Sequence, residues 1–185
     1  MEDFTGRGLD DLRDKIARTP LPPLQTFDDD PLRVIRCIRF ASRFDLAIEP
    51  SVEQAIHAPA IRNALRTKVS KERIGIEVNK MLNKTPYLAL TLISSLGLHA
   101  SVFSTSLDPP RDQVQRYCDI LRDVGKHFPT HVHHWFAAAV SPFDNATVTG
   151  KRTVPAVSHL ITDGLKVGIS ALTTNSSLAT KYVTA

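Results

Sequence analysis

Residues that favour helix starts recur along this 185-residue chain and divide most of it into short segments. Proline suits the first turn of a helix, because its φ is already helical and its missing N–H has no partner to lose there. Such prolines occur in Asp30-Pro31, Glu49-Pro50, Pro59, Pro86 and Asp108-Pro109-Pro110. Ser70 marks a further start, since its hydroxyl can cap the helix that follows. The pattern predicts a mainly α-helical chain.

The predicted helices follow from these starts and from apolar residues three or four positions apart. We expect helices at residues 31–44, 50–57, 59–65, 71–82, 86–97, 131–140 and 154–165, and one after Pro110 that ends near residue 124. Residues 1–27 are predicted to be loop and extended chain, because the prolines of Thr19-Pro20-Leu21-Pro22-Pro23 disfavour a helix. No strand-like alternation follows residue 30, and the last twenty residues, rich in Thr and Ser, are ambiguous.

The composition is typical of a soluble globular protein. Apolar residues make up 42% of the chain, no apolar run approaches the roughly 20 residues of a membrane span, and the N-terminus lacks the pattern of a signal peptide. Cys37 and Cys118 lack metal-site spacing and suit core packing in a reducing compartment. We expect an intracellular protein without a membrane partner. The sequence does not distinguish cytoplasm, nucleus and mitochondrion, and it does not indicate the oligomeric state.

An arginine stripe runs along the helix predicted at residues 31–44. Its apolar face holds Val34, Cys37, Ile38, Ala41 and Phe44, with Ile35 at the margin, and a separate sector holds Arg33, Arg36, Arg39 and Arg43. A solvated face is one interpretation, and Asp29 and Asp30 can offset Arg33. However, a cation in the first turn opposes the helix dipole, and no acid lies four residues from any of these arginines within the helix. The stripe therefore also fits a site for phosphate or a planar polar ligand, and the net charge of +4 permits a polyanionic partner.

Three segments in order carry a family resemblance. The first is T-G-R-G-L-D-D-L-R-D-K-I-A-R-T-P-L-P (5–22) with F-D-D-D-P-L-R-V-I-R-C-I-R-F-A-S-R-F (27–44), the second is V-S-K-E-R-I-G-I-E-V-N-K-M-L (69–82), and the third spans 88–103. Together they resemble the middle of eukaryotic CCA-adding enzymes, tRNA nucleotidyltransferases of the class shared with bacterial poly(A) polymerases. The second segment is similar to the helix written S-x-E-R-x-x-x-E in that family. The resemblance is strong from Phe4 to about Phe103 and weak beyond.

The resemblance implies a protein template for the incoming nucleotide. The family motif E-D-x-x-R matches Asp29, Asp30 and Arg33, with Asp in place of the usual Glu. A carboxylate only accepts hydrogen bonds and a guanidinium only donates them. Asp30 would accept from the exocyclic amine of cytosine or adenine while Arg33 donates to the ring nitrogen, so CTP and ATP fit and uracil and guanine do not. Arg36 would support Arg33 or reach a triphosphate, and Arg39 and Arg43 would contact RNA phosphate or serve the structure.

The resemblance also implies a division of the chain. We expect residues 1–27 to end a nucleotidyltransferase head domain, 28–97 to form the neck that binds nucleotide and RNA, and 98–185 to form part of a helical body. The G-G-x-V-R-D loop, the D-x-D pair that holds Mg²⁺ and the R-R-D motif do not occur. The chain is therefore expected to begin downstream of the catalytic centre, to contain no catalytic residue and to be inactive alone, since two-metal phosphoryl transfer requires carboxylate ligands. The alternative is a stand-alone helical module that binds RNA without catalysis.

Three further groups have competing interpretations. His131, His133 and His134 could suggest a metal site, but no carboxylate or cysteine lies nearby in sequence, and a helix start next to Trp135 is the other interpretation. Glu72, Arg73 and Glu77 could be an acid–base group, whereas the resemblance gives Glu72 or Arg73 the role of bracing the template helix. A basic set could follow a tRNA backbone or form a solvated face; it comprises Lys68, Lys71, Arg73, Lys80 and Lys84.

Overall fold

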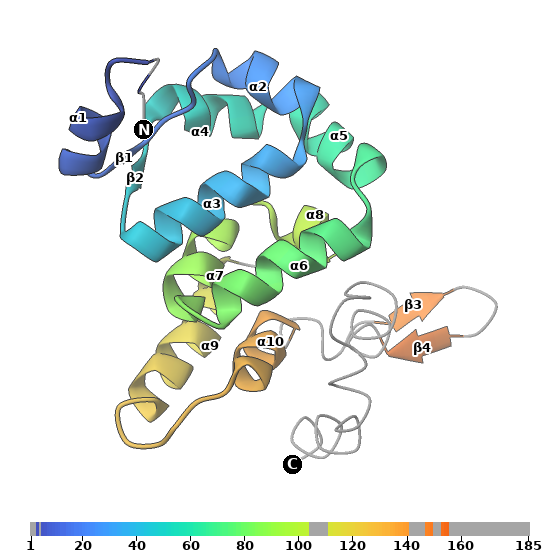
Figure 1. The fold of residues 1–185 in the computed structure, drawn as a ribbon. Coiled ribbons are helices and arrows are strands. Elements are labelled where there is room, and N and C mark those ends of the chain that lie inside the picture. Colours follow the sequence, from blue (N-terminus) through green and yellow to red (C-terminus); the bar gives the residue numbers. More distant parts are fainter. Residues whose placement is uncertain (1–2, 4, 104–110, 141–146, 150–152, 156–185) are drawn as a thin grey trace.

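The computed structural model describes residues 3, 5–103, 111–140, 147–149 and 153–155 (Figure 1). Helices dominate this part of the chain, which confirms the predicted fold class. The elements in chain order are α1 (Gly8–Arg13), β1 (Ile16–Ala17), α2 (Pro23–Asp29), α3 (Leu32–Phe44), β2 (Ala47–Ile48), α4 (Pro50–His57), α5 (Pro59–Lys68), α6 (Lys71–Leu82), α7 (Pro86–Ser95), α8 (His99–Phe103), α9 (Arg111–Val124), α10 (Val132–Val140), β3 (Thr147–Thr149) and β4 (Thr153–Pro155).

The helix starts predicted at Pro50, Pro59, Ser70 and Pro86 are confirmed, whereas the one predicted at Asp108-Pro109-Pro110 lies outside the described residues. Pro50, Pro59 and Pro86 each occupy the first turn of a helix, where a missing N–H leaves no carbonyl unpaired. The hydroxyl of Ser70 accepts a hydrogen bond from the backbone N–H of Arg73 over 3.4 Å and so caps α6. At α3 the regular helix begins one residue later than expected, but the Asp30 carboxylate accepts from the N–H of Leu32, as a capping residue would.

The prediction of loop and extended chain for residues 1–27 was wrong in two places. Helix α1 forms at Gly8–Arg13, and α2 begins at Pro23, inside the proline-rich stretch that was expected to prevent a helix. The reason is positional: only the last proline lies within the helix, at its first residue, so the prolines before it set the entry of the chain without removing any helical hydrogen bond.

The expectation of no strands after residue 30 was also wrong. β2 pairs in parallel with β1, with Ile16 opposite Ala47 and Ala17 opposite Ile48. β3 and β4 form a short antiparallel pair, so Val154 and Pro155 lie in a strand where a helix was predicted, and the remainder of that prediction, residues 156–165, lies outside the described residues. Two-residue strands carry too few positions to show an alternating pattern.

Helix α3 is the central element. Figure 1 shows it between α2, α4 and α5 on one side and α6 and α7 on the other. Its buried apolar residues are Leu32, Val34, Ile35, Ile38 and Ala41. Phe44, predicted on the apolar face, is instead half exposed and stacks on Phe40. Helix α3 thereby fixes where its arginines point, because its opposite face is anchored in the core.

The core continues from α3 through α4 to α10, joining the predicted neck and body residues in one buried cluster. Helix α2 runs across the domain boundary expected at residue 27, and the boundaries themselves stay a prediction. No helix in the described part of the chain is long and apolar enough to cross a membrane.

Candidate nucleotide-binding site

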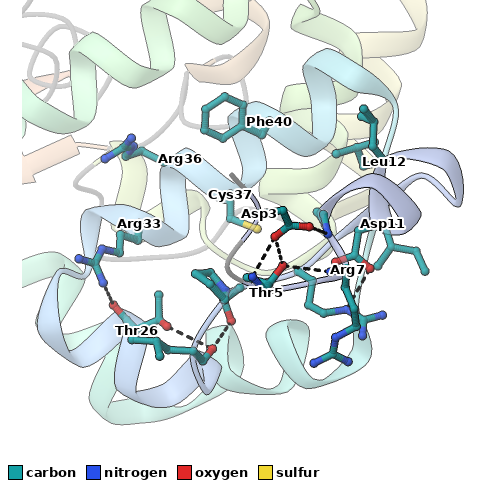
Figure 2. A pocket seen from close by; sticks show the side chains of 18 of the residues that line it. Asp3, Thr5, Arg7, Asp11, Leu12, Thr26, Arg33, Arg36, Cys37 and Phe40 are labelled. Carbon is teal, nitrogen blue, oxygen red and sulfur yellow. Dashed lines mark hydrogen bonds and ion pairs between the residues drawn. The ribbon is translucent and has the colours of Figure 1, made fainter. Parts of the chain in front are cut away.

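A cleft of about 780 Å³ lies between the N-terminal segment and one face of α3 (Figure 2). Four residues of α3 line it, namely Arg33, Arg36, Cys37 and Phe40. The facing wall is formed by Asp3 and by residues from 5 to 21, including parts of α1 and β1, and Thr26 and Phe27 of α2 close one side. Two of the four arginines of the predicted stripe thus face a cavity that can admit a ligand.

Hydrogen bonds hold the facing wall in place. The Asp3 carboxylate accepts from the hydroxyl and backbone N–H of Thr5 and from the N–H of Gly8, at 2.6, 2.9 and 2.6 Å. The hydrogen bond from the Thr5 hydroxyl, with those from the backbone, keeps the pKa of Asp3 below its usual value. Asp11 pairs with Arg18 at 3.4 Å. The two acids of this wall that line the cleft are therefore already engaged within it.

The cleft has an excess of positive charge. Arg7, Arg33 and Arg36 line it without a carboxylate at ion-pair distance among the described residues, and Figure 2 shows Arg33 and Arg36 on one helix face. Arg33 donates from Nη1 to the carbonyl oxygen of Thr26 over 3.2 Å. An anionic ligand would gain charge-assisted hydrogen bonds from these guanidinium groups. The cavity therefore suits a phosphate-bearing ligand.

The three consecutive acids point to separate partners. Asp28 lies 3.9 Å from Lys68, Asp29 is exposed at the end of α2, and Asp30 accepts from the N–H of Leu32 and lies 3.4 Å from Nη2 of Arg73. Asp29 and Asp30 do not line the cleft. The backbone N–H of Arg33 donates to the carbonyl of Asp30 over 3.0 Å, but among the described residues the two side chains bond to other groups, Arg33 to Thr26 and Asp30 to Arg73. Their roles in base selection stay a prediction.

Helix α6 holds α3 through a second, more buried ion pair. Glu77 is 9% exposed and accepts from Nε of Arg39 over 2.6 Å and from Lys80 over 2.9 Å. Burial opposes ionisation of Glu77, but the hydrogen bonds and charges of Lys80 and Arg39 outweigh it, and its pKa lies below the ordinary value. With Arg73 on Asp30, α6 contacts both the residues just before α3 and the middle of that helix.

The bracing role of Glu77 was missed from sequence, although a signal existed. Glu77 lies beside Ile74, Val78 and Met81 on the buried face of α6, and a buried acid requires a cation or hydrogen bonds. Its partner could not be inferred, because Arg39 is 38 residues away. Because Arg39 is paired with Glu77, its charge is neutralised and it is not available to a ligand.

The other predicted site residues lie outside the cleft. Arg43 is exposed, with its guanidinium carbon 5.7 Å from the ring centre of Phe44. Glu72 lies exposed in the first turn of α6. Lys71, Lys80 and Lys84 are exposed along or just after α6, and Lys68 ends α5. These cations follow two consecutive helices, α5 and α6.

The histidines near α10 make local contacts. The backbone N–H of His131 donates to Nδ1 of His134 over 3.0 Å, and the two rings lie 5.8 Å apart. Within the described part of the chain, no three His, Cys, Asp or Glu side chains gather in a way that could hold a metal ion.

Comparisons with known proteins agree with the resemblance. Residues 45–107 match the family model described as "Probable RNA and SrmB- binding site of polymerase A". The chain is 53% identical over 104 residues to the mitochondrial CCA tRNA nucleotidyltransferase of Saccharomyces cerevisiae, a match that covers 56% of this chain and 19% of that protein. It is 49% identical over 104 residues to the tRNA nucleotidyltransferase cca1 of Schizosaccharomyces pombe, covering 56% and 21%.

A longer match is found with the tRNA nucleotidyltransferase cca2 of Schizosaccharomyces pombe, at 36% identity over 173 residues, covering 85% of this chain and 36% of that protein. The chain thus spans between about a fifth and about a third of the length of these relatives. The order of the matched motifs, the helical fold and these identities agree with one another. By these measures the chain is similar to part of the tRNA nucleotidyltransferases, CCA-adding enzymes among them.

Proposed function

We propose that this chain supplies base selection and tRNA binding to a CCA-adding tRNA nucleotidyltransferase, which adds C, C and A to tRNA 3′ ends from CTP and ATP. The observation that carries the proposal is the cleft lined by Arg33 and Arg36, on a helix whose neighbouring residues match the family motif. The protein acts inside the cell; one relative bears the name of a mitochondrial enzyme, and the compartment of this chain is not assigned by that name.

Base selection would use Asp30 and Arg33 as an acceptor and a donor. Among the described residues, the partner of the Arg33 guanidinium is the neutral carbonyl of Thr26, so this guanidinium is available to bond a ring nitrogen of the base instead. Asp30 is 29% exposed on its side chain and its contact with Arg73 is long, at 3.4 Å. A carboxylate has room for several acceptor contacts, so Asp30 could receive an exocyclic amine while Arg73 keeps it ionised and oriented.

For the chain alone, we propose binding without nucleotidyl transfer. Mg²⁺ would supply the activation of the attacking hydroxyl and the neutralisation of the triphosphate in the intact enzyme. The acids present here do not fit such a site, because Asp28, Asp29 and Asp30 are directed to different surroundings and the second is not in the cleft. No step of the reaction is therefore assigned to them.

Nucleotide binding tests the proposal directly. The purified chain should bind CTP and ATP more tightly than UTP and GTP in a calorimetric titration. Asp30→Ala and Arg33→Ala should remove that preference, whereas Arg43→Ala, which removes the same charge from the exposed C-terminal part of α3, should leave it intact. Equal affinity for all four nucleotides in the parent chain would refute base selection at this site.

A second assay addresses transfer. Incubation of the chain with CTP, ATP, Mg²⁺ and a tRNA lacking its CCA end should yield no extended product, and measurable addition would contradict the proposed inactivity.

The alternative is a helical module that binds RNA without selecting a base. It is favoured by the match of residues 45–107 to a family model described as an RNA-binding site, which excludes Asp30 and Arg33. Under this alternative, Asp30→Ala would leave both RNA binding and nucleotide binding unchanged.

A further inference from the structure

A second basic cluster lies away from the cleft, where α5, the end of α7 and the start of α9 meet. Arg62 of α5 donates from Nη2 to the carbonyl oxygen of Leu96 over 2.7 Å, and the same nitrogen lies 2.8 Å from Nδ1 of His57. Arg111 is the first residue of α9. Around the place that a Cβ on Gly97 would occupy, the nearest atoms are Nη2 of Arg62 at 3.2 Å, Nη2 of Arg111 at 3.5 Å and Nη1 of Arg62 at 3.6 Å. Two guanidinium groups thus converge over one glycine.

The converging charges lack a counter-charge. In the part of the chain that the structure describes, neither Arg62 nor Arg111 has a carboxylate within ion-pair distance. Like charges this close repel, and Arg111 also meets the positive end of the α9 dipole. Two cations that are destabilised by mutual repulsion and by a helix dipole are expected where an anion binds between them.

The structural role of Arg62 does not account for the cluster. Arg62 reaches the last carbonyls of α7, where a cation is favourable, and this explains its own position. However, its Nε is buried without a hydrogen-bond partner, and the contact with Leu96 gives no reason for Arg111 to approach. Within the described part of the chain, the two side chains offer more N–H donors than the hydrogen bonds they make.

Gly97 leaves the space between the two groups open. Its φ of +62° is left-handed, so glycine is favoured there on conformational grounds. A side chain at this position would also fill the volume that both guanidinium groups border. A small anion is the kind of ligand that fits, and a phosphate matches the donor fork of arginine.

We propose that Arg62 and Arg111 together bind one phosphate group of the RNA backbone at the junction of α7 and α9. This inference rests on the proposed function, which gives the chain tRNA as its partner. Arg62 and Gly97 lie within the residues that match the RNA-binding family model, and Arg111 extends the contact beyond them. The site is separate from the cleft, which neither residue lines.

Salt-dependent RNA binding tests the site. A fluorescent tRNA transcript lacking its CCA end is titrated with the full chain over a series of NaCl concentrations. Each phosphate contact contributes about 0.7–0.9 to the slope of log K against log salt, so Arg111→Ala should lower the slope by about that amount and weaken binding several-fold at low salt. Arg111→Lys should restore much of the slope, because it keeps the charge.

Arg116→Ala is the matched control. Arg116 lies on the same helix, is exposed, and has no ion pair among the described residues, so its removal changes the net charge equally. The slope of log K against log salt for Arg116→Ala should equal that of the parent chain. An equal loss in Arg111→Ala and Arg116→Ala, or no loss in Arg111→Ala, would overturn the phosphate site while leaving tRNA binding intact. Failure of the parent to bind the transcript would instead overturn the proposed function along with this inference.

A titration with inorganic phosphate distinguishes a site for free phosphate from a site for a phosphate of the RNA backbone. Side-chain Nε–H resonances of arginine are followed by NMR, with folding of each variant checked by circular dichroism. Shifts at Arg62 and Arg111 that accompany the slope change with tRNA support the site. The same shifts without any slope change would assign it to free phosphate and refute the RNA assignment.

Discussion

Replacement of Glu77 by glutamine should destabilise the protein far more than its small change in shape suggests. The substitution keeps the size of the side chain and an acceptor oxygen but removes the charge that compensates Arg39, whose side chain is only 15% exposed. Two unit charges about 4 Å apart attract by about 4 kcal/mol at an effective dielectric constant near 20, and breaking a buried pair costs about 3–5 kcal/mol. Because glutamine retains a neutral hydrogen bond and the pair is not fully buried, we expect a loss of about 2–3 kcal/mol.

Urea unfolding measures this loss. With a slope of about 2 kcal/mol per molar urea for a chain of this size, the midpoint should fall by about 1–1.5 M. Lys80→Gln serves as the control, because Lys80 contacts the other oxygen of Glu77 but is 54% exposed, and an exposed pair is worth about 0–1 kcal/mol. In an Arg39→Met background, Glu77→Gln should cost much less, since no buried cation is left unpaired. A loss under about 1 kcal/mol, or one equal to that of the control, would refute the reasoning.

Three other predictions concern the same fold. The folded-state pKa of Glu77 is lowered from 4.5. The contribution of its negative charge to stability is therefore complete above pH 4.5 and is lost as the pH falls through the folded pKa. Urea titrations in the acid range should show that the gap in unfolding free energy between the parent and Glu77→Gln narrows below pH 4.5. Ser70→Ala should cost about 0.5–1 kcal/mol in the same assay, at the lower end for a cap because the hydrogen bond is long; no loss would mean that the cap is not formed. Burial raises the pKa of Cys37 to about 11 and that of Cys118, with help from Asp119, to about 12, so both thiols should react with a disulfide reagent at pH 8 only after unfolding, and fast labelling of the folded protein would contradict this.

Local chemistry explains which parts of the fold could be predicted from the sequence. Proline at the first turn and serine as a cap act within three or four residues, so α4, α5, α6 and α7 could be located from the residues at their starts. Pro23 was misread because several prolines precede it, and only the last enters the helix. The pairing of β1 with β2 was not predictable, since two residues on each side carry no periodic signal and the partners lie 31 positions apart, Ile16 opposite Ala47.

In the candidate site, too, the features set by local sequence could be predicted and those set by tertiary packing could not. The one-sided arginine stripe of α3 could be predicted, because the spacing of Val34, Ile35 and Ile38 determines which face is buried. The acceptors that bond to the stripe could not be predicted, because Glu77 and the backbone carbonyl of Thr26 reach it through tertiary packing. Sequence therefore identified cations on one face of a helix, and only the structure separated Arg33 and Arg36, which face the cleft, from Arg39, which is neutralised.

The pairing of β1 with β2 limits how far the cleft is able to widen. Ala47 donates to the carbonyl of Lys15 over 2.8 Å and Glu49 donates to that of Ala17 over 3.1 Å, so the wall of the cleft is fastened to the chain just beyond the C-terminal end of α3. At the Arg33 end the same wall continues directly along the chain into α2. The wall is therefore held against α3 at one end by strand pairing and at the other by the chain itself, so the width of the cleft is fixed by the fold at both of its ends.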